Sequence, residues 1–265
     1  MNHETRAALL RINRIFYDEY ASSFGGTRAL PWPAWRQLLE PLRDGEHDRP
    51  LRILDVGCGN GRFGSLAAET LPYAFEYEGW DQSQGLLDQA QERLEGRRLG
   101  DLPDDQLAGL TLKAVDLNHW MEDEPQPASA GGYDVIGMFG VLHHMPGRQF
   151  RADLLQRLGT LLAPGGKLWV SWWMLHRTDR FQKKTVSWDR APVELDLDDV
   201  EPGDHLLSWH RDGFGIRYLH FPTEDELVEL DSLEGLEALA PLESDGPTGR
   251  ENLYLRWTRA SIPPA

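Results

Sequence analysis

Cysteine is nearly absent from this chain, and so are long apolar runs. The 265 residues contain a single cysteine, which excludes an internal disulfide. No stretch reaches the ~18 consecutive apolar residues that a membrane-spanning helix needs. The N-terminal segment carries charges throughout, whereas a secretory signal has an apolar core. We therefore expect a cytoplasmic protein with no membrane partner.

Basic residues are scarce as well. The chain has 27 lysines and arginines against 43 aspartates and glutamates, which gives a formal net charge of −16. A protein that binds nucleic acid unaided usually has a basic face. This balance argues against DNA as a partner, and an RNA substrate would need a local basic patch or a helper protein. Residues 176–190 are a basic stretch with aromatic residues that could stack on bases, although a solvated loop explains them equally well.

Strand and helix patterns alternate through the middle of the chain. Short buried strands are expected at residues 51–56, 75–81, 110–117, 133–139 and 167–173, with helices at 64–70, 83–94 and 150–162. Residues 236–242 and 252–258 complete the pattern as a terminal antiparallel pair. The alternation predicts an α/β fold: a doubly wound, seven-stranded, mostly parallel sheet of the Rossmann-like kind, with an antiparallel last strand.

Two segments lie outside this alternation. Helical spacing of apolar residues before residue 50 predicts an N-terminal helical lid over residues 1–50, followed by the main domain at 51–265. Residues 175–216 are polar, contain Trp188 and Trp209, lack periodicity and are too long for an ordinary connection. We interpret them as an irregular insertion on the substrate side of the main domain.

The segment Ile53-Leu-Asp-Val-Gly-Cys-Gly-Asn-Gly61 gives the strongest ligand-binding signal. A buried strand runs into a glycine-rich turn, where the backbone can approach a ligand beyond the carboxyl end of the sheet. A dinucleotide site has no need of the carboxylate of Asp55 before the first glycine, and its glycine spacing differs. A carboxylate there suits a cofactor with an ammonium and a sulfonium group, which S-adenosyl-L-methionine has. The predicted contacts are Asp55, Gly57, Cys58, Gly59, Asn60 and Gly61, with Cys58 a small filler and no metal site.

Asp81 ends the second predicted strand. It follows the glycine turn by roughly the ~20 residues at which a ribose-binding acid is expected. Its carboxylate can accept hydrogen bonds from both ribose hydroxyls. The alternative is a helix cap formed by Asp81 or Ser83. After the glycine turn we favour ribose binding, with Gln82 and Ser83 beside it.

The next two strand ends supply further candidates. Asp116 and Leu117 would reach the adenine, although Asp116 could equally be a solvated strand end. Gly140 and Val141 follow the fourth strand, where the transferring methyl group is expected. Two histidines come next, and we expect His143 to act as a base or to orient the acceptor while His144 is structural.

Residues 51–173 together resemble class I S-adenosylmethionine-dependent methyltransferases. A narrower resemblance, to the tRNA wobble 5-carboxymethyluridine methyltransferases and their bacterial relatives, spans nearly the whole chain. It is carried by Tyr17-Asp18, Phe24, Thr27-Arg28, Pro31-Trp32-Pro33, Asp55 to Gly61, His143-His144, Arg217-Tyr218-Leu-His220-Phe221 and Glu251-Asn252-Leu-Tyr254. That family esterifies the carboxylate of 5-carboxymethyluridine in the tRNA anticodon, together with a small zinc-binding activator subunit. The resemblance therefore implies tRNA and such a subunit as partners.

The same resemblance implies a set of residues around the methyl-transfer site: Tyr17, Arg28, Trp32, His143, Arg217 and Tyr218, of which Tyr17, Arg28 and Trp32 would also contact the cofactor. A carboxylate acceptor is ionised near neutral pH, so the reaction needs alignment more than a base. Arg28 and Arg217 could orient it, since guanidinium binds carboxylate bidentately. A hydroxyl or amine acceptor would instead need His143 as base. This chain departs from the family at Ser208-Trp209, where the family has proline–tryptophan, and in a longer following loop.

Two other functions stay open on the sequence. The acidic surface and the tryptophans near the insertion suit a compact apolar pocket, and so a methyltransferase for a small-molecule carboxylate or natural product. The chain could also be a non-catalytic, cofactor-binding partner of another subunit.

Overall fold

The buried strands assemble into one seven-stranded sheet. The structure, a computed structural model, describes residues 1–26, 30–45, 48–100, 106–124, 131–178, 181, 183–210 and 213–261. The strands of this sheet are β1 (Leu51–Val56), β2 (Phe75–Asp81), β3 (Leu107–Ala114), β4 (Tyr133–Phe139), β5 (Leu162–Trp173), β9 (Leu236–Ser244) and β10 (Asn252–Arg259). Their spatial order is β3-β2-β1-β4-β5-β10-β9.

The pairing of the strands confirms the predicted fold class. Strand β1 pairs in parallel with β2 and β4, while β2–β3 and β4–β5 are also parallel. Strand β10 is antiparallel to both β5 and β9. The bounds of β1, β2 and β4 coincide with the prediction. The third strand lies three residues earlier than predicted, because Asp116 and the residues after it begin a short helix.

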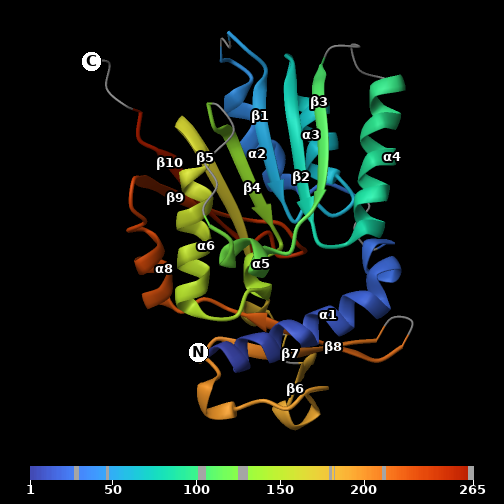
Figure 1. Ribbon diagram of the computed structural model, residues 1–265, viewed down its shortest axis with the longest axis vertical. Coiled ribbons are helices and arrows are strands. Elements are labelled where there is room, and N and C mark those ends of the chain that lie inside the picture. The colour runs from blue at the N-terminus through green and yellow to red at the C-terminus, as the bar shows by residue number, and fades with distance from the viewer. Residues whose placement is uncertain are drawn as a thin grey trace.

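Helices cover both faces of the sheet (Figure 1). One face carries α2 (Pro33–Leu39), α3 (Arg62–Thr70) and α4 (Gln84–Gly100), and the other carries α5 (Leu117–Glu122), α6 (Arg148–Thr160) and α8 (Glu224–Leu230). Successive strand residues point to opposite faces. Ile53 accordingly packs with the first group of helices and Leu54 with the second, and both are fully buried. Burial of each such side chain stabilises the fold by about 1.5–3 kcal/mol.

A second, three-stranded sheet lies beyond the carboxyl ends of the main strands. It consists of β6 (Thr185–Val186), β7 (Asp204–Trp209) and β8 (Gly215–His220), paired antiparallel in that order. Helix α1 (His3–Gly26) runs between this small sheet and the main sheet (Figure 1). Its buried Phe16 and Tyr20 pack against Trp209 and Leu219 of the small sheet. Helix α2, by contrast, packs on the main sheet.

The expectation of irregular structure over residues 175–216 is wrong where β6, β7 and the first two residues of β8 form. The reason is that β7 and β8 are buried along almost their whole length, so apolar and polar residues do not alternate. Several buried positions hold ionisable residues, among them Asp204, Arg217 and His220. Short 3₁₀ turns at Leu175–Arg177, Trp188–Arg190 and Leu197–Asp199 connect the strands.

No helix within the described part of the chain is both long enough and apolar enough to cross a membrane.

Candidate active site

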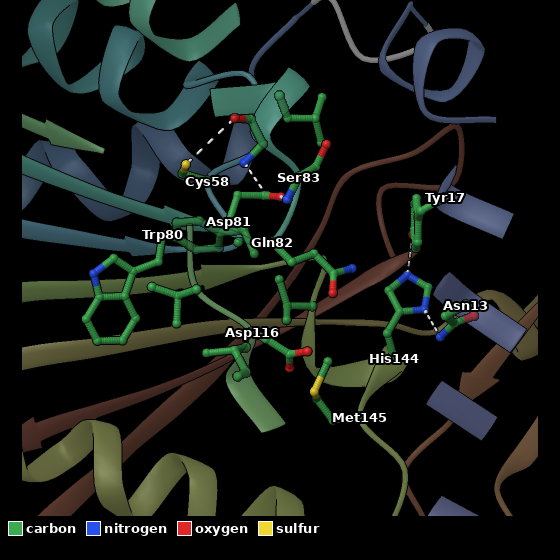
Figure 2. Close-up of a pocket in the computed structure, with 18 of the residues that line it drawn as sticks. Asn13, Tyr17, Cys58, Trp80, Asp81, Gln82, Ser83, Asp116, His144 and Met145 are labelled. Carbon is green, nitrogen blue, oxygen red and sulfur yellow. Dashed lines mark hydrogen bonds between the residues drawn. The ribbon is translucent and has the colours of Figure 1, made fainter. Parts of the chain in front are cut away.

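A cavity of about 570 Å³ lies between helix α1 and the carboxyl ends of the main-sheet strands (Figure 2). Its floor comes from the turns that follow β1, β2 and β4, and from the start of α5. Its opposite wall comes from α1, through Ala7, Leu10, Arg11, Asn13, Arg14 and Tyr17. These six residues recur at helical spacing, so they form one face of α1. The cavity therefore combines strand-end turns with a polar helix face.

The glycine turn after β1 leaves its backbone open to a ligand. Gly57 and Gly59 have φ of 73° and 53°, a left-handed conformation that other residues adopt only with strain. A Cβ atom added to Gly59 would meet nothing within 4 Å, and Gly59 lines the cavity. Gly61 serves a different purpose, because its α-carbon faces Ala90 of α4, whose atoms would lie 3.2 Å from an added Cβ.

Two carboxylates flank the turn. Asp55 accepts a hydrogen bond of 2.6 Å from the hydroxyl of Tyr77, and burial raises the pKa of Asp55 from 3.8 to about 7. Asp81 accepts hydrogen bonds of 2.9 Å from the backbone N–H groups of Gly59 and Ser83. Burial raises the pKa of Asp81 as well, and those backbone donors oppose the rise. Asp81 thus connects the two turns and still has lone pairs facing the cavity.

Thirteen of the sequence-predicted residues line this cavity: Tyr17, Asp55, Gly57, Cys58, Gly59, Asn60, Asp81, Gln82, Ser83, Asp116, Leu117, Gly140 and Val141. Asp116 is there as the N-cap of α5, where it accepts the N–H of Asn118 at 2.9 Å. It also forms an ion pair of 3.2 Å with Arg14 of α1. Burial raises the pKa of the Cys58 thiol far above its ordinary value, which argues against a nucleophilic role.

The remaining predicted residues lie elsewhere. Trp32, Gly61, His143, Arg217 and Tyr218 are outside the cavity wall, and Arg28 falls outside the described residues. Trp32 borders a separate shallow depression with Leu30 and Pro33.

The Arg217-Tyr218 block lies beneath α1, which separates it from the cavity. The Arg217 guanidinium lies 5.1 Å from the ring centre of Trp173 and is almost fully buried. The Tyr218 hydroxyl donates to Asp204 at 2.6 Å. The ring of His143 stacks on Trp173 with the ring centres 4.2 Å apart. These side chains therefore pack under the helix and not in the cavity wall, and their contact with the acceptor stays a prediction.

His144, which was expected to be structural, lines the cavity instead of His143. Its Nε2 atom lies 2.8 Å from the hydroxyl of Tyr17. Its Nδ1 atom lies 3.1 Å from the carbonyl oxygen of Tyr218 and 3.3 Å from the amide nitrogen of Asn13. Figure 2 shows His144 held between Tyr17 and Asn13, both from α1. The polar residues at helical spacing on α1 were the sequence signal that could have identified this wall.

The contacts of His144 define its neutral tautomer. The carbonyl of Tyr218 can only accept, so Nδ1 carries the proton and Nε2 accepts from the Tyr17 hydroxyl. The amide of Asn13 is itself oriented, because its Oδ1 accepts the backbone N–H of Tyr218 at 2.8 Å. The contact of its amide nitrogen with Nδ1 is 3.3 Å, longer than the 3.1 Å contact of Nδ1 with the carbonyl, and it is a hydrogen bond only in the other tautomer.

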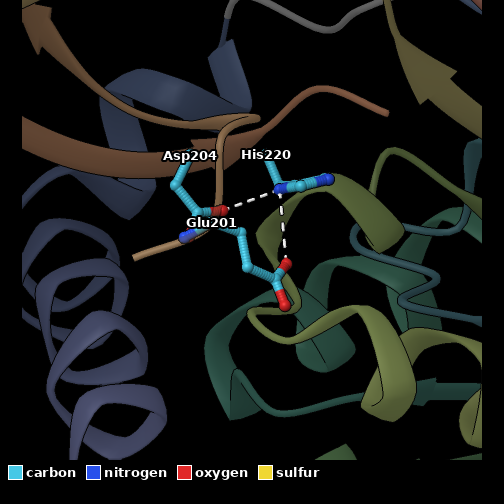
Figure 3. A group of neighbouring side chains, drawn as sticks. All are labelled: Glu201, Asp204 and His220. Carbon is cyan, nitrogen blue, oxygen red and sulfur yellow. Dashed lines mark hydrogen bonds and ion pairs between the residues drawn. The ribbon is translucent and has the colours of Figure 1, made fainter. Parts of the chain in front are cut away.

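A second cluster of ionisable groups lies between the small sheet and helices α6 and α8, and Figure 3 shows its members Glu201, Asp204 and His220. His220 of β8 has Nδ1 at 2.7 Å from Asp204 and Nε2 at 2.8 Å from Glu226 of α8. Arg151 of α6 pairs with Glu226 at 2.6 Å and with Glu201 at 2.8 Å. Burial opposes a charged imidazole, but the hydrogen bonds to Asp204 and Glu226 outweigh it and raise the pKa of His220.

Glu201, Asp204 and His220 bring their oxygen and nitrogen atoms within 4.8 Å of one another, as metal ligands do. Both ring nitrogens of His220 are nevertheless hydrogen-bonded to carboxylates, and the Arg151 guanidinium lies 2.9 Å from Nε2. A cation among these groups favours an ion network over a metal centre. The network joins the small sheet to α6 and α8.

The sequence comparisons identify a methyltransferase domain. Residues 54–168 match the family model for the methyltransferase domain. The tRNA (carboxymethyluridine(34)-5-O)-methyltransferase ALKBH8 of Mus musculus is 29% identical over 184 residues, which cover 69% of this chain and 23% of that protein. A putative methyltransferase of Encephalitozoon cuniculi is 26% identical over 240 residues, which cover 90% of this chain and 91% of that protein. The chain thus spans about a quarter of the mouse protein.

The comparison of structures shows the fold. A crystal structure of an S-adenosylmethionine-dependent methyltransferase from Clostridium acetobutylicum superimposes with a TM-score of 0.61 at 12% identity and covers 92% of this chain and 99% of that chain. Together with the sequence matches, this confirms the predicted class I methyltransferase with S-adenosylmethionine as its cofactor.

The cavity fits this cofactor. The open space above Gly59 accommodates a ligand against the backbone, and the acids Asp55, Asp81 and Asp116 complement a sulfonium and an ammonium group. We propose that Asp81 binds the ribose hydroxyls and that Asp55 binds the ammonium of the methionine end. Bound S-adenosylmethionine supplies the electrophilic methyl group.

Replacement of Asp81 tests the ribose assignment. Asp81→Ala should weaken the binding of S-adenosylhomocysteine at least roughly tenfold in calorimetry, because hydrogen bonds to a charged acceptor are lost. Glu76→Ala is the control, since Glu76 lies at the other end of β2 and its side chain is 52% exposed. Unchanged affinity in Asp81→Ala would reject the assignment.

The raised pKa of Asp55 predicts pH-dependent cofactor binding. Below pH 7 the free protein holds Asp55 mostly protonated, and an ammonium can pair only with the ionised form. The affinity for S-adenosylhomocysteine should therefore fall by up to about tenfold per pH unit as the pH drops below 7, and level off above it. Calorimetry from pH 5.5 to pH 8.5 measures this. Asp55→Asn should bind more weakly with a flat profile, and a flat profile in the wild type would contradict the pairing.

The ion network predicts that replacing Arg151 destabilises the protein more than replacing an exposed arginine of the same helix. Arg151→Met should lower the free energy of unfolding by about 3–5 kcal/mol, because it leaves buried carboxylates without their cation. The matched control is Arg148→Met on the same helix, whose ion pair with Glu229 is 43% exposed on both sides and should contribute less than about 1 kcal/mol. Urea unfolding of both variants measures the difference, and equal losses would argue against a network.

Proposed function

We propose that this chain transfers the methyl group of S-adenosylmethionine to a carboxylate on tRNA, the carboxymethyl group of the wobble uridine. The observation that carries the proposal is the polar face of α1, which places Arg11, Arg14 and Tyr17 opposite the acids of the cofactor side. The name of the mouse relative, a tRNA carboxymethyluridine methyltransferase, supports the same acceptor. A zinc-binding activator subunit, which the family resemblance implies, is part of the proposal.

The charges in the cavity wall are divided between its two sides. The strand-end turns contribute Asp55, Asp81 and Asp116, which suit a cationic cofactor. Helix α1 contributes the exposed side chains of Arg11 and Arg14. Guanidinium groups bind carboxylates and phosphates through parallel hydrogen bonds. In a chain of net charge −16, this helix face is the local basic patch that an anionic acceptor requires.

For such an acceptor, the protein mainly has to align the carboxylate with the methyl group of S-adenosylmethionine. A carboxylate is ionised near neutral pH, so no proton has to be removed before it attacks. The hydrogen bond from Tyr17 to His144 holds the Tyr17 side chain in the cavity wall, and α1 covers the cavity against water. Exclusion of water strengthens the attraction between the arginines of α1 and an acceptor anion.

We also propose that α1 and the small sheet act as one substrate-side cap. This proposal modifies the expected arrangement of a lid at residues 1–50 and an insertion at 175–216. Helix α1 packs on β7 and β8, whereas α2 contributes Trp35 and Leu38 to the core of the main sheet. Of the helices α1 and α2, only α1 therefore belongs to this cap.

A labelling experiment tests the acceptor. The purified protein is incubated with methyl-labelled S-adenosylmethionine and bulk tRNA, with and without an activator subunit. Label should enter tRNA and should leave as methanol under mild alkali, because a methyl ester is saponified while N-methyl and ribose methyl groups are stable.

Three results contradict the proposal: no label in tRNA under either condition, alkali-stable label, or label that enters a metabolite extract instead. The last result would support the small-molecule carboxylate as acceptor.

Arg11 provides a variant for the same assay. Arg11→Ala should lower kcat/KM for tRNA on the order of tenfold, by loss of one charge-assisted contact, and leave S-adenosylhomocysteine binding unchanged. Arg6→Ala is the matched control on the same helix, because the Arg6 guanidinium lies 4.6 Å above the ring centre of Phe150 and does not line the cavity. If both variants lower kcat/KM equally, the positive charge of α1 as a whole matters for the acceptor, and a specific contact in the cavity wall does not.

A further inference from the structure

We propose that Arg62 binds the carboxylate of the methionine end of S-adenosylmethionine, so that Arg62 and Asp55 hold the two charges of that zwitterion. The proposal rests on S-adenosylmethionine as the cofactor and is independent of the methyl acceptor. It adds a cationic subsite to the acids already described.

Arg62 is placed by the glycine turn. It follows Gly61, whose φ of 74° makes it the left-handed N-cap of α3, and it is the first residue of that helix. The side chain is 8% exposed and lines the same cavity as Asp55 and Gly59. The N-terminus of a helix itself favours a nearby anion. Arg62 therefore lies at the cofactor turn, on the opposite side from the arginines of α1.

The guanidinium of Arg62 has partners, but no described carboxylate forms an ion pair with it. Its Nη1 donates to the carbonyl oxygen of Leu30 at 2.8 Å, and its Cζ lies 5.2 Å from the ring centre of Trp35. The carboxylate of Asp55 is hydrogen-bonded to Tyr77 instead. Burial lowers the pKa of Arg62 to about 10, so the group stays cationic at neutral pH.

A buried cation that forms no ion pair with a described carboxylate is costly, and an incoming carboxylate removes that cost. Trp35, Phe63 and Phe139 line this end of the cavity and keep its dielectric low, which strengthens a charge-assisted pair. The other strand-end positions carry the acids Asp81 and Asp116, which repel a carboxylate. Among the described residues of the floor, Arg62 is thus the cation that matches the acid end of the ligand.

Ligands that lack defined parts of the methionine end test the assignment directly. S-adenosylmethionine is compared with decarboxylated S-adenosylmethionine, which lacks only the carboxylate, and S-adenosylhomocysteine with 5′-methylthioadenosine, which lacks the whole amino-acid end. Calorimetry gives the dissociation constants for wild type, Arg62→Met, Arg62→Lys and a control, Arg157→Met. Arg157 also lies over a tryptophan ring and donates to backbone carbonyls, but it is outside the cavity wall.

The wild type should bind S-adenosylmethionine at least roughly tenfold more tightly than its decarboxylated analogue. Arg62→Met should bind the two equally, bind S-adenosylhomocysteine at least tenfold more weakly than wild type, and retain wild-type affinity for 5′-methylthioadenosine. Arg62→Lys, which keeps the charge, should lose less affinity for S-adenosylhomocysteine. Arg157→Met should behave as wild type.

The same measurements can overturn the proposal. If the wild type does not distinguish the decarboxylated analogue, the carboxylate has no cationic partner in the site. If Arg62→Met or Arg62→Lys weakens 5′-methylthioadenosine as much as S-adenosylhomocysteine, Arg62 has only a structural role. If Arg62→Met has no cooperative thermal transition, it is not folded and its affinities are not used. The affinities of Arg62→Lys for S-adenosylhomocysteine and 5′-methylthioadenosine then decide between a binding and a structural role. A failure of tRNA methylation leaves all of these binding results unaffected, so the two proposals fail separately.

Discussion

The hydrogen bond between Asn13 and the backbone of Tyr218 is the contact on which the site depends. It fixes α1 to β8 at the point where the helix crosses the carboxyl ends of the main strands. Because α1 is fixed there, Tyr17 reaches His144, and Arg11 and Arg14 face the cavity. The aromatic packing of α1 on the small sheet excludes water around this contact and strengthens it. Without α1 in this position the carboxyl ends of the main strands would be open to solvent.

The buried ion network fixes the small sheet, on which α1 packs. Small antiparallel sheets are marginal alone and need packing against other elements. The pairing of His220 with Asp204 and Glu226, and of Arg151 with Glu226, connects β7 and β8 to two helices of the main sheet. Buried charges are weak contributors to stability, yet they tolerate few alternative arrangements. The buried charges therefore fix the position of the small sheet, and the small sheet in turn holds α1 at a fixed distance from the cofactor turn.

Much of the fold could be predicted from the sequence, because the central strands are buried on both faces. Strands such as β1 and β4 appear as short apolar runs ended by glycine, so their bounds were predicted correctly. The glycine turn and Asp81 were recognisable because they depend on local chain geometry and on one fixed spacing.

The cap could not be predicted in the same way, because it depends on contacts between distant segments. Strand β8 buries Arg217 and His220 together with apolar residues, so neither periodicity nor composition marks it as a strand. The choice between His143 and His144 is set by a 3₁₀ turn at Leu142–His144, which points one ring at Trp173 and the other at the cavity. A family motif names both histidines but cannot orient them. The sequence does not single out Arg62 as a ligand contact, because the residue after a glycine turn ordinarily begins a helix without contacting the ligand.

The division of charge in the cavity reconciles an acidic protein with the proposed anionic acceptor. Exposed charges separated by more than about 8 Å are largely screened at physiological ionic strength, so the net charge of the chain matters little at the cavity mouth. Among the described residues that line the cavity, Arg11 and Arg14 are the exposed cations, and Arg14 is already paired with Asp116. The net charge still slows the approach of a polyanion, since long-range steering depends on the whole field. Under the proposed function, the arginines of α1 would position a carboxylate once tRNA is bound but would not recruit tRNA. Recruitment is then the step at which the proposed partner subunit would act.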